Sequence, residues 1–168
     1  GRPVTNATDR GSVLASSDDG AALFLIGQGA SPEGNRPFVD KLDLGTGEST
    51  RLWQSAAPYY ELPVALLDDE GKRLLTRRES VNDPPNYFVR DLARDSLDRI
   101  TSFPHPTPQL AGATKELIRY QRADGVQLTG TLYLPPDYQE GAGPLPMLMW
   151  AYPIEFKDAG FAGQVSDS

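Results

Sequence analysis

The first hundred residues alternate short apolar runs with clusters of turn-forming residues, and they carry no helical stripe. One apolar run, Leu23–Ile26, begins three residues after the turn sequence Asp18-Asp19-Gly20. Short apolar runs bounded by Gly, Pro, Asn and Asp are typical of β-strands. From Gly11 onward we therefore predict an all-β structure, with short strands over residues 11–102.

This pattern occurs twice, in the order turn, strand, loop rich in Gly or Pro, strand and turn. The offset between the copies is 51 residues at Gly20 and Gly71, 50 at Phe38 and Phe88, and 48 at Asp43 and Asp91. A repeat of about 50 residues with about four short strands in each copy is typical of β-propeller blades. Because a propeller closes with typically 4–8 blades, we expect residues 1–102 to be a partial propeller within a longer protein.

A proline-dense segment, Phe103-Pro104-His105-Pro106-Thr107-Pro108, follows the repeats. Each proline ring fixes its own φ and restricts the residue before it, so the segment is stiff. We predict a linker over residues 103–110 and a second domain over 111–168. His105 is the one histidine of the chain, and we expect it to be a linker residue and not a catalytic base.

Three predicted strands open this second domain. Asp124-Gly125 is a tight-turn dipeptide between Lys115–Arg122 and Val126–Leu134, which predicts a β-hairpin. Pro135-Pro136 ends the second strand, because proline has no N–H for the ladder. Met147–Tyr152 is nearly continuously apolar, a pattern typical of a strand that is buried on both faces.

In this order, the motifs resemble the entry into the α/β-hydrolase domain of the prolyl oligopeptidase family, and within it the glutamyl endopeptidase branch. The matching pieces are Phe103–Pro106, Lys115–Arg122, Asp124–Leu128, Thr131–Pro136 and Tyr152–Lys157. The resemblance implies the last blades of a β-propeller followed by the first strands of an α/β-hydrolase domain. It also implies a serine peptidase that hydrolyses peptides by acyl transfer, with a preference for acidic residues.

Composition narrows the possible partners. The formal net charge of −7 and the isoelectric point near 4.7 disfavour nucleic acid and anionic membrane surfaces. The chain has no cysteine, which excludes disulfides and thiol catalysis and fits any compartment. The location stays open, with a secreted or periplasmic location favoured over a cytoplasmic one. We predict no cofactor and no membrane partner. The expected partners are a peptide substrate and the remainder of the propeller and hydrolase domain.

The sequence holds no complete catalytic triad. No Gly-x-Ser-x-Gly nucleophile elbow occurs, since the nearest match, Gly160-Phe161-Ala162-Gly163, lacks the serine. Ser166 and Ser168 have no histidine near them in the sequence. The resemblance places the nucleophile, acid and histidine beyond Ser168, so we expect this chain alone to be inactive.

Tyr152 is the candidate catalytic residue. The resemblance implies that its hydroxyl donates to an oxyanion hole, where preorganised donors stabilise the charge that develops on the substrate carbonyl. The glutamyl endopeptidase pattern has Gly where this chain has Ile154. The alternative is a tyrosine that ends a core strand and finds a polar partner there.

Two arginines are candidates for substrate binding. Arg77 and Arg78 end a strand of the second repeat, and a guanidinium that faces an interior cavity could hold an acidic substrate side chain in a bidentate fork. The alternative, a solvated or structural pair with Glu79, is favoured because exposed charge pairs are common.

The acidic pairs Asp18-Asp19 and Asp68-Asp69 suggest calcium ligands. Each pair precedes a glycine-containing turn and lacks the spacing of a calcium loop, so we predict turn initiation and no metal.

The rival function is a β-propeller binding module without catalytic activity, to which residues 109–153 add only a small sheet. A Gly-x-Ser-x-Gly sequence downstream of Ser168, followed by Asp and His, would favour the peptidase.

Overall fold

The computed structural model of the chain describes residues 1–8, 11–31 and 34–151. The chain divides into two compact units, the first from Gly1 to Pro104 and the second beginning at His105. Within the described ranges the one helix is the short 3-10 turn η1 (Pro108–Leu110). No described helix is long and apolar enough to cross a membrane.

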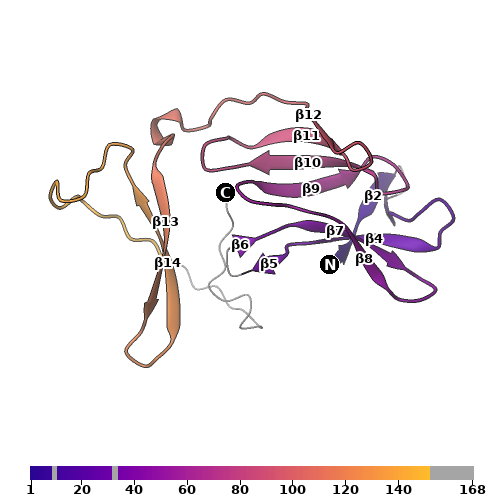
Figure 1. Ribbon diagram of the computed structural model, residues 1–168, viewed down its shortest axis with the longest axis horizontal. Helices are drawn as coiled ribbons and strands as arrows, with labels where there is room; N and C mark the ends of the chain where they lie inside the picture. The colour runs from indigo at the N-terminus through magenta and orange to yellow at the C-terminus, as the bar shows by residue number, and fades with distance from the viewer. Residues whose placement is uncertain (9–10, 32–33, 152–168) are drawn as a thin grey trace. The chain divides into compact units, whose positions relative to one another are not determined.

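Two four-stranded antiparallel sheets make up most of the first unit (Figure 1). The first has the order β1-β4-β7-β8, with β1 (Arg2–Pro3), β4 (Ala22–Gly27), β7 (Phe38–Asp43) and β8 (Ser49–Gln54). The second has the order β9-β10-β11-β12, with β9 (Tyr60–Leu66), β10 (Arg73–Glu79), β11 (Asn86–Asp91) and β12 (Ser96–Arg99). Two further strands, β5 (Ala30–Ser31) and β6 (Gly34–Asn35), pair within the loop before β7. The prediction of short antiparallel strands is confirmed, but β1 of the first sheet lies before residue 11, where the predicted strands begin.

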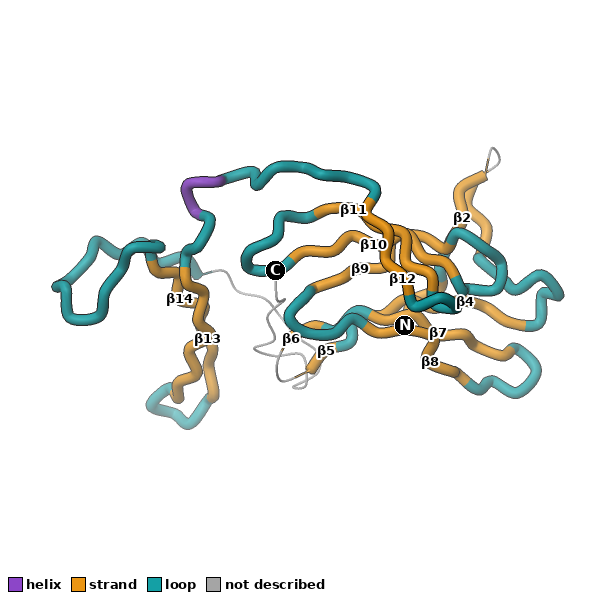
Figure 2. The backbone as a smooth tube through the Cα atoms, turned by 45° about the horizontal axis from the view of Figure 1, so that its top comes forward, coloured by secondary structure: helices purple, strands orange, loops and turns teal. Residues whose placement is uncertain are grey.

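Equivalent strands keep the predicted spacing. The starts of β4 and β10 are 51 residues apart, those of β7 and β11 are 48 apart, and those of β8 and β12 are 47 apart. In the second sheet the strands lie side by side in chain order (Figure 1), and Figure 2 shows β9, β10 and β11 next to one another from a second side. Three strands of each sheet therefore come from one copy of the sequence repeat, whereas β1 of the first sheet lies before its copy.

The edge of the first sheet, next to β4, differs from the prediction. The sequence predicts that the β-structure begins at Gly11, but residues before Gly11 also pair with β4. Two separate pieces of chain occupy this position. The backbone N–H of Val4 donates to the carbonyl of Phe24 (2.9 Å), and the N–H of Phe24 donates to the carbonyl of Ala15 (3.2 Å). Between the pieces the chain leaves the sheet as a hairpin of β2 (Thr5–Thr8) and β3 (Gly11–Leu14). The backbone N–H and C=O groups at the edge of β4 need hydrogen-bond partners. The chain around Val4 supplies some of them and the chain around Ala15 supplies the others.

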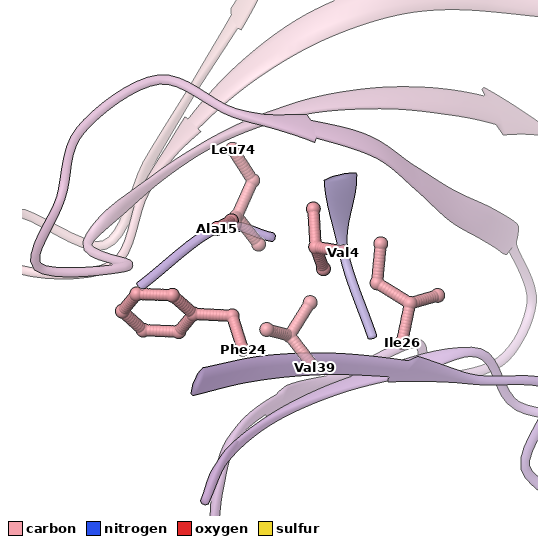
Figure 3. Packing of buried hydrophobic residues seen from close by; sticks show 6 residues of the cluster. All are labelled: Val4, Ala15, Phe24, Ile26, Val39 and Leu74. Atoms are coloured by element: carbon pink, nitrogen blue, oxygen red, sulfur yellow. The ribbon is translucent and has the colours of Figure 1, made fainter. Parts of the chain in front are cut away.

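The hydrophobic core of the first unit lies between its two sheets (Figure 3). Side chains alternate between the two faces of a strand, and on β4 every second residue is buried. The cluster consists of Val4, Ala15, Phe24, Ile26, Val39 and Leu74. Leu74 comes from β10 in the second sheet, whereas Phe24 and Val39 come from the first. The two sheets therefore share one core.

The second sheet carries apolar side chains on its other face as well. Leu74 and Phe88 are buried on the face that packs on the first sheet, and Leu75 and Val89, which alternate with them, are half-buried. Strands that are apolar on both faces are typical of sheets covered on both sides.

Aspartates begin the turns, as predicted. Oδ1 of Asp19 accepts the N–H of Ala21 (3.0 Å). Oδ1 of Asp68 accepts the N–H groups of Glu70 (3.1 Å) and Lys72 (2.9 Å). Within the described residues no three His, Cys, Asp or Glu side chains are grouped so that they could hold a metal ion.

Asn86 fixes the point at which the chain leaves the second sheet. Its side chain is 1% exposed. Oδ1 accepts the N–H of Phe103 (2.7 Å) and the hydroxyl of Thr101 (2.9 Å), and Nδ2 donates to the carbonyl of Phe103 (3.3 Å). Asn86 thus binds Phe103 through both backbone groups, so the predicted linker begins at a fixed position. Further along, Nδ1 of His105 accepts the N–H of Thr107 (3.1 Å).

In the second unit the predicted hairpin is present. It pairs β13 (Thr114–Gln121) with β14 (Gln127–Leu134) in one continuous register. Gly125 in the turn has φ of 89°, a left-handed conformation that glycine adopts without steric cost.

The predicted strand over Met147–Tyr152 is wrong for its described part. Residues 147–151 form no strand, and Leu148 and Trp150 are 95% and 85% exposed. A strand is buried on both faces only where neighbouring strands and covering layers surround it. Among the described residues β13 and β14 pair only with each other, so the sheet that this prediction needs is missing. Tyr152 lies outside the described residues.

We predict that Gly71→Ala destabilises the first unit more than Gly20→Ala. Both glycines have a left-handed φ, 69° and 68°, so alanine costs about 1–2 kcal/mol of backbone strain at either position. A Cβ on Gly71 would also lie 2.5 Å from Cε1 of Phe24 and 2.9 Å from Cδ1 of Leu52, whereas nothing lies within 4 Å at Gly20. Overpacking adds about 1–3 kcal/mol. Urea unfolding of the two variants measures the difference, and equal losses of stability would contradict the packing at Gly71.

Candidate functional site

A pocket of about 320 Å³ opens in the first unit beside the connection between the two sheets. Its walls come from the end of β8, the connecting residues and strands β9 to β11. The residues that line it are Trp53, Gln54, Ala56, Ala57, Pro58, Tyr59, Glu61, Arg78 and Arg90. Two aromatic rings, two arginines and one carboxylate thus meet in one pocket.

Ser55 holds the connection in place. Its side chain is 4% exposed, and its backbone N–H donates to the carbonyl of Pro37 (2.8 Å). The Ser55 hydroxyl donates to the carbonyl of Tyr59 (3.0 Å) and accepts the N–H of Glu61 (3.0 Å). These bonds fix both ends of the segment that carries Tyr59.

Glu61 is the buried charge at the base of the pocket, with 3% exposure. Nε of Arg90 donates to its Oε1 (2.9 Å) and Nη2 of Arg90 donates to its Oε2 (2.8 Å), which is the bidentate geometry of a strong pair. The hydroxyl of Thr76 adds a third bond to Oε1 (2.8 Å). A buried carboxylate needs such partners, because burying an unpaired charge is very unfavourable.

Arg78 is held differently. It lies opposite Glu61 in the strand register, but its Nε is 3.7 Å from Oε2 of Glu61, too far for a hydrogen bond. Its guanidinium carbon lies 3.3 Å from the centroid of the Tyr59 ring, in a cation–π contact. Nε of Arg78 is buried without a hydrogen-bond partner in the part of the chain that the structure describes. Two arginines therefore face one carboxylate, which leaves one positive charge in excess.

Of the two predicted arginines, the pocket contains Arg78 and not Arg77. Neighbouring residues of a strand point to opposite faces, so Arg77 lies on the other side of β10. There its Nη2 is 3.7 Å from Oε1 of Glu79. The substrate-binding role of both arginines stays a prediction.

The other candidate residues lie beyond the described ranges. These are Tyr152, the Gly160–Gly163 sequence, Ser166 and Ser168. The oxyanion role of Tyr152 therefore stays a prediction.

Sequence reasoning missed the ion cluster of Glu61, Thr76 and Arg90. Glu61 and Arg90 are 29 residues apart, and no motif connects them. One signal was present, because Glu61 is a lone charge within the otherwise apolar run that starts at Tyr60 and ends at Leu67. A charge at a buried strand position predicts a partner of opposite charge.

A second group of charges forms where the equivalent turns of the two repeats meet. A pocket of about 360 Å³ is lined there by Ser17, Asp18, Asp19, Lys41, Asp69, Glu70 and Lys72. A hydrogen bond with Asp69 and the negative charge of that residue raise the pKa of Asp18. The hydroxyl of Ser17 and the N–H of Ala21 lower the pKa of Asp19. The sequence repeat places these two acidic turns at equivalent positions of adjacent sheets.

The chain is similar in sequence to two plant proteins, each named "Probable glutamyl endopeptidase, chloroplastic". Identity is 45% over 182 residues for the protein of Oryza sativa subsp. japonica and 43% over 183 residues for that of Arabidopsis thaliana. Both alignments cover 100% of this chain and 19% of the relative, so the chain spans about a fifth of the length of these relatives. No protein-family profile matches the chain.

Two solved structures of AtxE2 isopeptidase also match, an apo form and a variant with Astexin3-dC4 bound. Both have a TM-score of 0.43, with 15% and 16% sequence identity, and cover 83% of this chain and 22% of the isopeptidase chain. This level of similarity is too low to indicate a function. The sequence relatives remain the informative comparison, and they are named as peptidases.

We predict that Asp18→Asn raises the melting temperature at pH 7. The folded-state pKa of Asp18 is raised, chiefly through Asp69, so ionising Asp18 costs stability as the pH rises from its unfolded pKa to its folded pKa. The gain from Asp18→Asn should vanish at about pH 3, where Asp18 is protonated.

Asp19→Asn is the matched control, with the same change of charge at the next residue. The folded-state pKa of Asp19 is lowered, so its contribution to stability is present above the unfolded pKa and is lost as the pH falls through the folded pKa. Asp19→Asn should therefore lower the melting temperature at pH 7. Changes of the same sign in the melting temperature at pH 7 for both variants would contradict the opposite pKa shifts of Asp18 and Asp19.

Proposed function

We propose that this chain is part of a serine-type peptidase of the prolyl oligopeptidase family, which hydrolyses peptides by acyl transfer and prefers acidic residues. The observation that carries the proposal is the identity of 43% and 45%, over the whole chain, with two proteins named as glutamyl endopeptidases. The motifs from Phe103 to Lys157 add to it, because they resemble the start of the hydrolase domain in that family. The expected secreted or periplasmic location stays a prediction, and both relatives are named as chloroplastic.

The fold of the first unit supports the propeller part of this proposal. Two successive sheets of four strands share one core, and the second sheet carries the half-buried apolar side chains of Leu75 and Val89 on its other face. A blade of a propeller packs on a neighbouring blade at each face. In the complete protein, Leu75 and Val89 would then be covered by a further blade.

The hairpin of β13 and β14 supports the hydrolase part. An isolated two-stranded hairpin is marginally stable in water, so this pair needs further strands or a covering helix. In the proposed protein the rest of the hydrolase domain supplies them, and with them the catalytic serine, acid and histidine.

We predict that the 168-residue chain alone does not hydrolyse peptides, because it contains neither the nucleophile elbow nor a histidine placed as its base. The assay compares purified chain with the complete protein on peptides that contain one glutamate, and on matched peptides with glutamine in its place. The complete protein should cleave after glutamate and lose activity to a serine-directed reagent. Turnover by the chain alone, blocked by the same reagent, would contradict the first expectation, and equal cleavage after glutamine would contradict the acidic preference.

A further prediction concerns Tyr152 in the complete protein. Tyr152→Phe removes one donor from the proposed oxyanion hole and should lower kcat about 10²–10³-fold, with little change in KM, because the bond forms in the transition state. A structural tyrosine would instead show a stability loss of about 1 kcal/mol and an unaltered kcat. Steady-state kinetics and thermal unfolding of the same variant separate the two roles.

The binding-module alternative has one observation in its favour, which is the pocket beside Arg78. Among the described residues, all those that line the pocket belong to the first unit.

A further inference from the structure

We propose that the pocket beside Arg78 binds a carboxylate group of a peptide, either an acidic side chain or the C-terminal carboxylate. The site needs no catalytic group, so it can be tested whether or not the complete protein is a peptidase. Three features of the pocket carry the proposal: its charge, the way Arg78 is held, and its apolar wall.

The charge of the pocket is unbalanced. The carboxylate of Glu61 already accepts two bonds from Arg90 and one from Thr76. Arg78 approaches the same carboxylate only to 3.7 Å. One carboxylate cannot neutralise two guanidinium groups, so a second carboxylate is the complementary ligand.

The guanidinium of Arg78 is held in an orientation that suits a carboxylate ligand. Its side chain is 22% exposed, and its planar group stacks on the ring of Tyr59 at 3.3 Å from the centroid. Stacking occupies the face of the guanidinium and leaves the N–H groups in its plane. Within the described residues no hydrogen bond of Arg78 is present, and its Nε is buried. Because Tyr59 itself is fixed through Ser55, less side-chain entropy is lost when a ligand binds.

The rest of the pocket fits the carbon stem of an amino acid. Ala56, Ala57 and Pro58 line one part of it, together with Trp53. The volume of about 320 Å³ is at the lower end of the range for small-molecule sites, roughly 300–1,000 Å³. A single acidic residue with its neighbouring backbone is therefore a suitable occupant.

The binding experiment uses Trp53 as the reporter. The chain contains two tryptophans, and Trp150 is 85% exposed in the second unit, so Trp150→Phe leaves Trp53 as the only indole without disturbing the pocket. Trp53 fluorescence is then titrated with N-acetylglutamate amide, with N-acetylglutamine amide as its uncharged isostere, and with N-acetylalanine, which carries only a terminal carboxylate.

We expect a saturable change with at least one of the two carboxylate ligands and none with the glutamine ligand. Response to the glutamate ligand identifies side-chain recognition, and response to N-acetylalanine identifies recognition of a chain end. Equal responses to glutamate and glutamine ligands, or no response to any of the three, would overturn the proposal. This comparison involves no change at Arg78, so it decides the question even if pocket variants fold poorly.

Arg78→Gln should weaken carboxylate binding about tenfold or more, since a charged hydrogen bond is worth about 1.5–3 kcal/mol. Arg78→Lys keeps the charge but loses the planar fork, so it should restore only part of the affinity. Arg94→Gln is the matched control, because Arg94 is 83% exposed in the turn after β11 and lies outside the pocket.

The variant Arg77→Gln tests which of the two neighbouring arginines, Arg77 or Arg78, binds the carboxylate. Arg77 is adjacent in sequence but lies on the other face of β10, so its loss should leave the affinity unchanged. Binding that is lost in Arg77→Gln and kept in Arg78→Gln would overturn the assignment to this pocket.

Discussion

The contact of Leu74 with the inner face of the first sheet is the constraint on which the rest of the first unit depends. A four-stranded sheet buries an apolar face only against another layer, and here each sheet is the other's layer. Phe24 and Leu74 are both 0% exposed, although they come from different copies of the repeat. The turn at Gly71 lies against Phe24, so the position of one turn also depends on this core.

The pocket follows from the same arrangement. Along β10, Leu74, Thr76 and Arg78 share one face, and this face passes from the apolar core to the pocket. Thr76 is fully buried and gives its hydroxyl to Glu61, which links core and pocket. Packing at Leu74 therefore sets the position of Arg78, because both side chains stand on one strand.

Local patterns predicted most of the strands, and the failures have physical causes. Apolar runs and turn dipeptides are local signals, so the two repeats and the hairpin at Asp124-Gly125 could be found from the sequence. The divided edge strand beside β4 could not, because backbone pairing between Val4 and Phe24 depends on the tertiary fold. The run at Met147–Tyr152 has the composition of a buried strand, but burial depends on neighbours that a local pattern does not reveal.

The pocket adds a physical argument about Arg78 itself. One arginine is enough to neutralise Glu61, and Arg90 already does so with two hydrogen bonds. A second arginine beside this pair adds like charge at close range, and removing it from water is unfavourable unless it gains a partner. The ring of Tyr59 offsets part of this cost, but it satisfies none of the N–H donors. A carboxylate ligand would balance the charge of Arg78 and accept hydrogen bonds from the exposed part of its guanidinium, although the buried Nε would stay without a partner. The stability of the fold alone therefore does not explain why an arginine stands at this position.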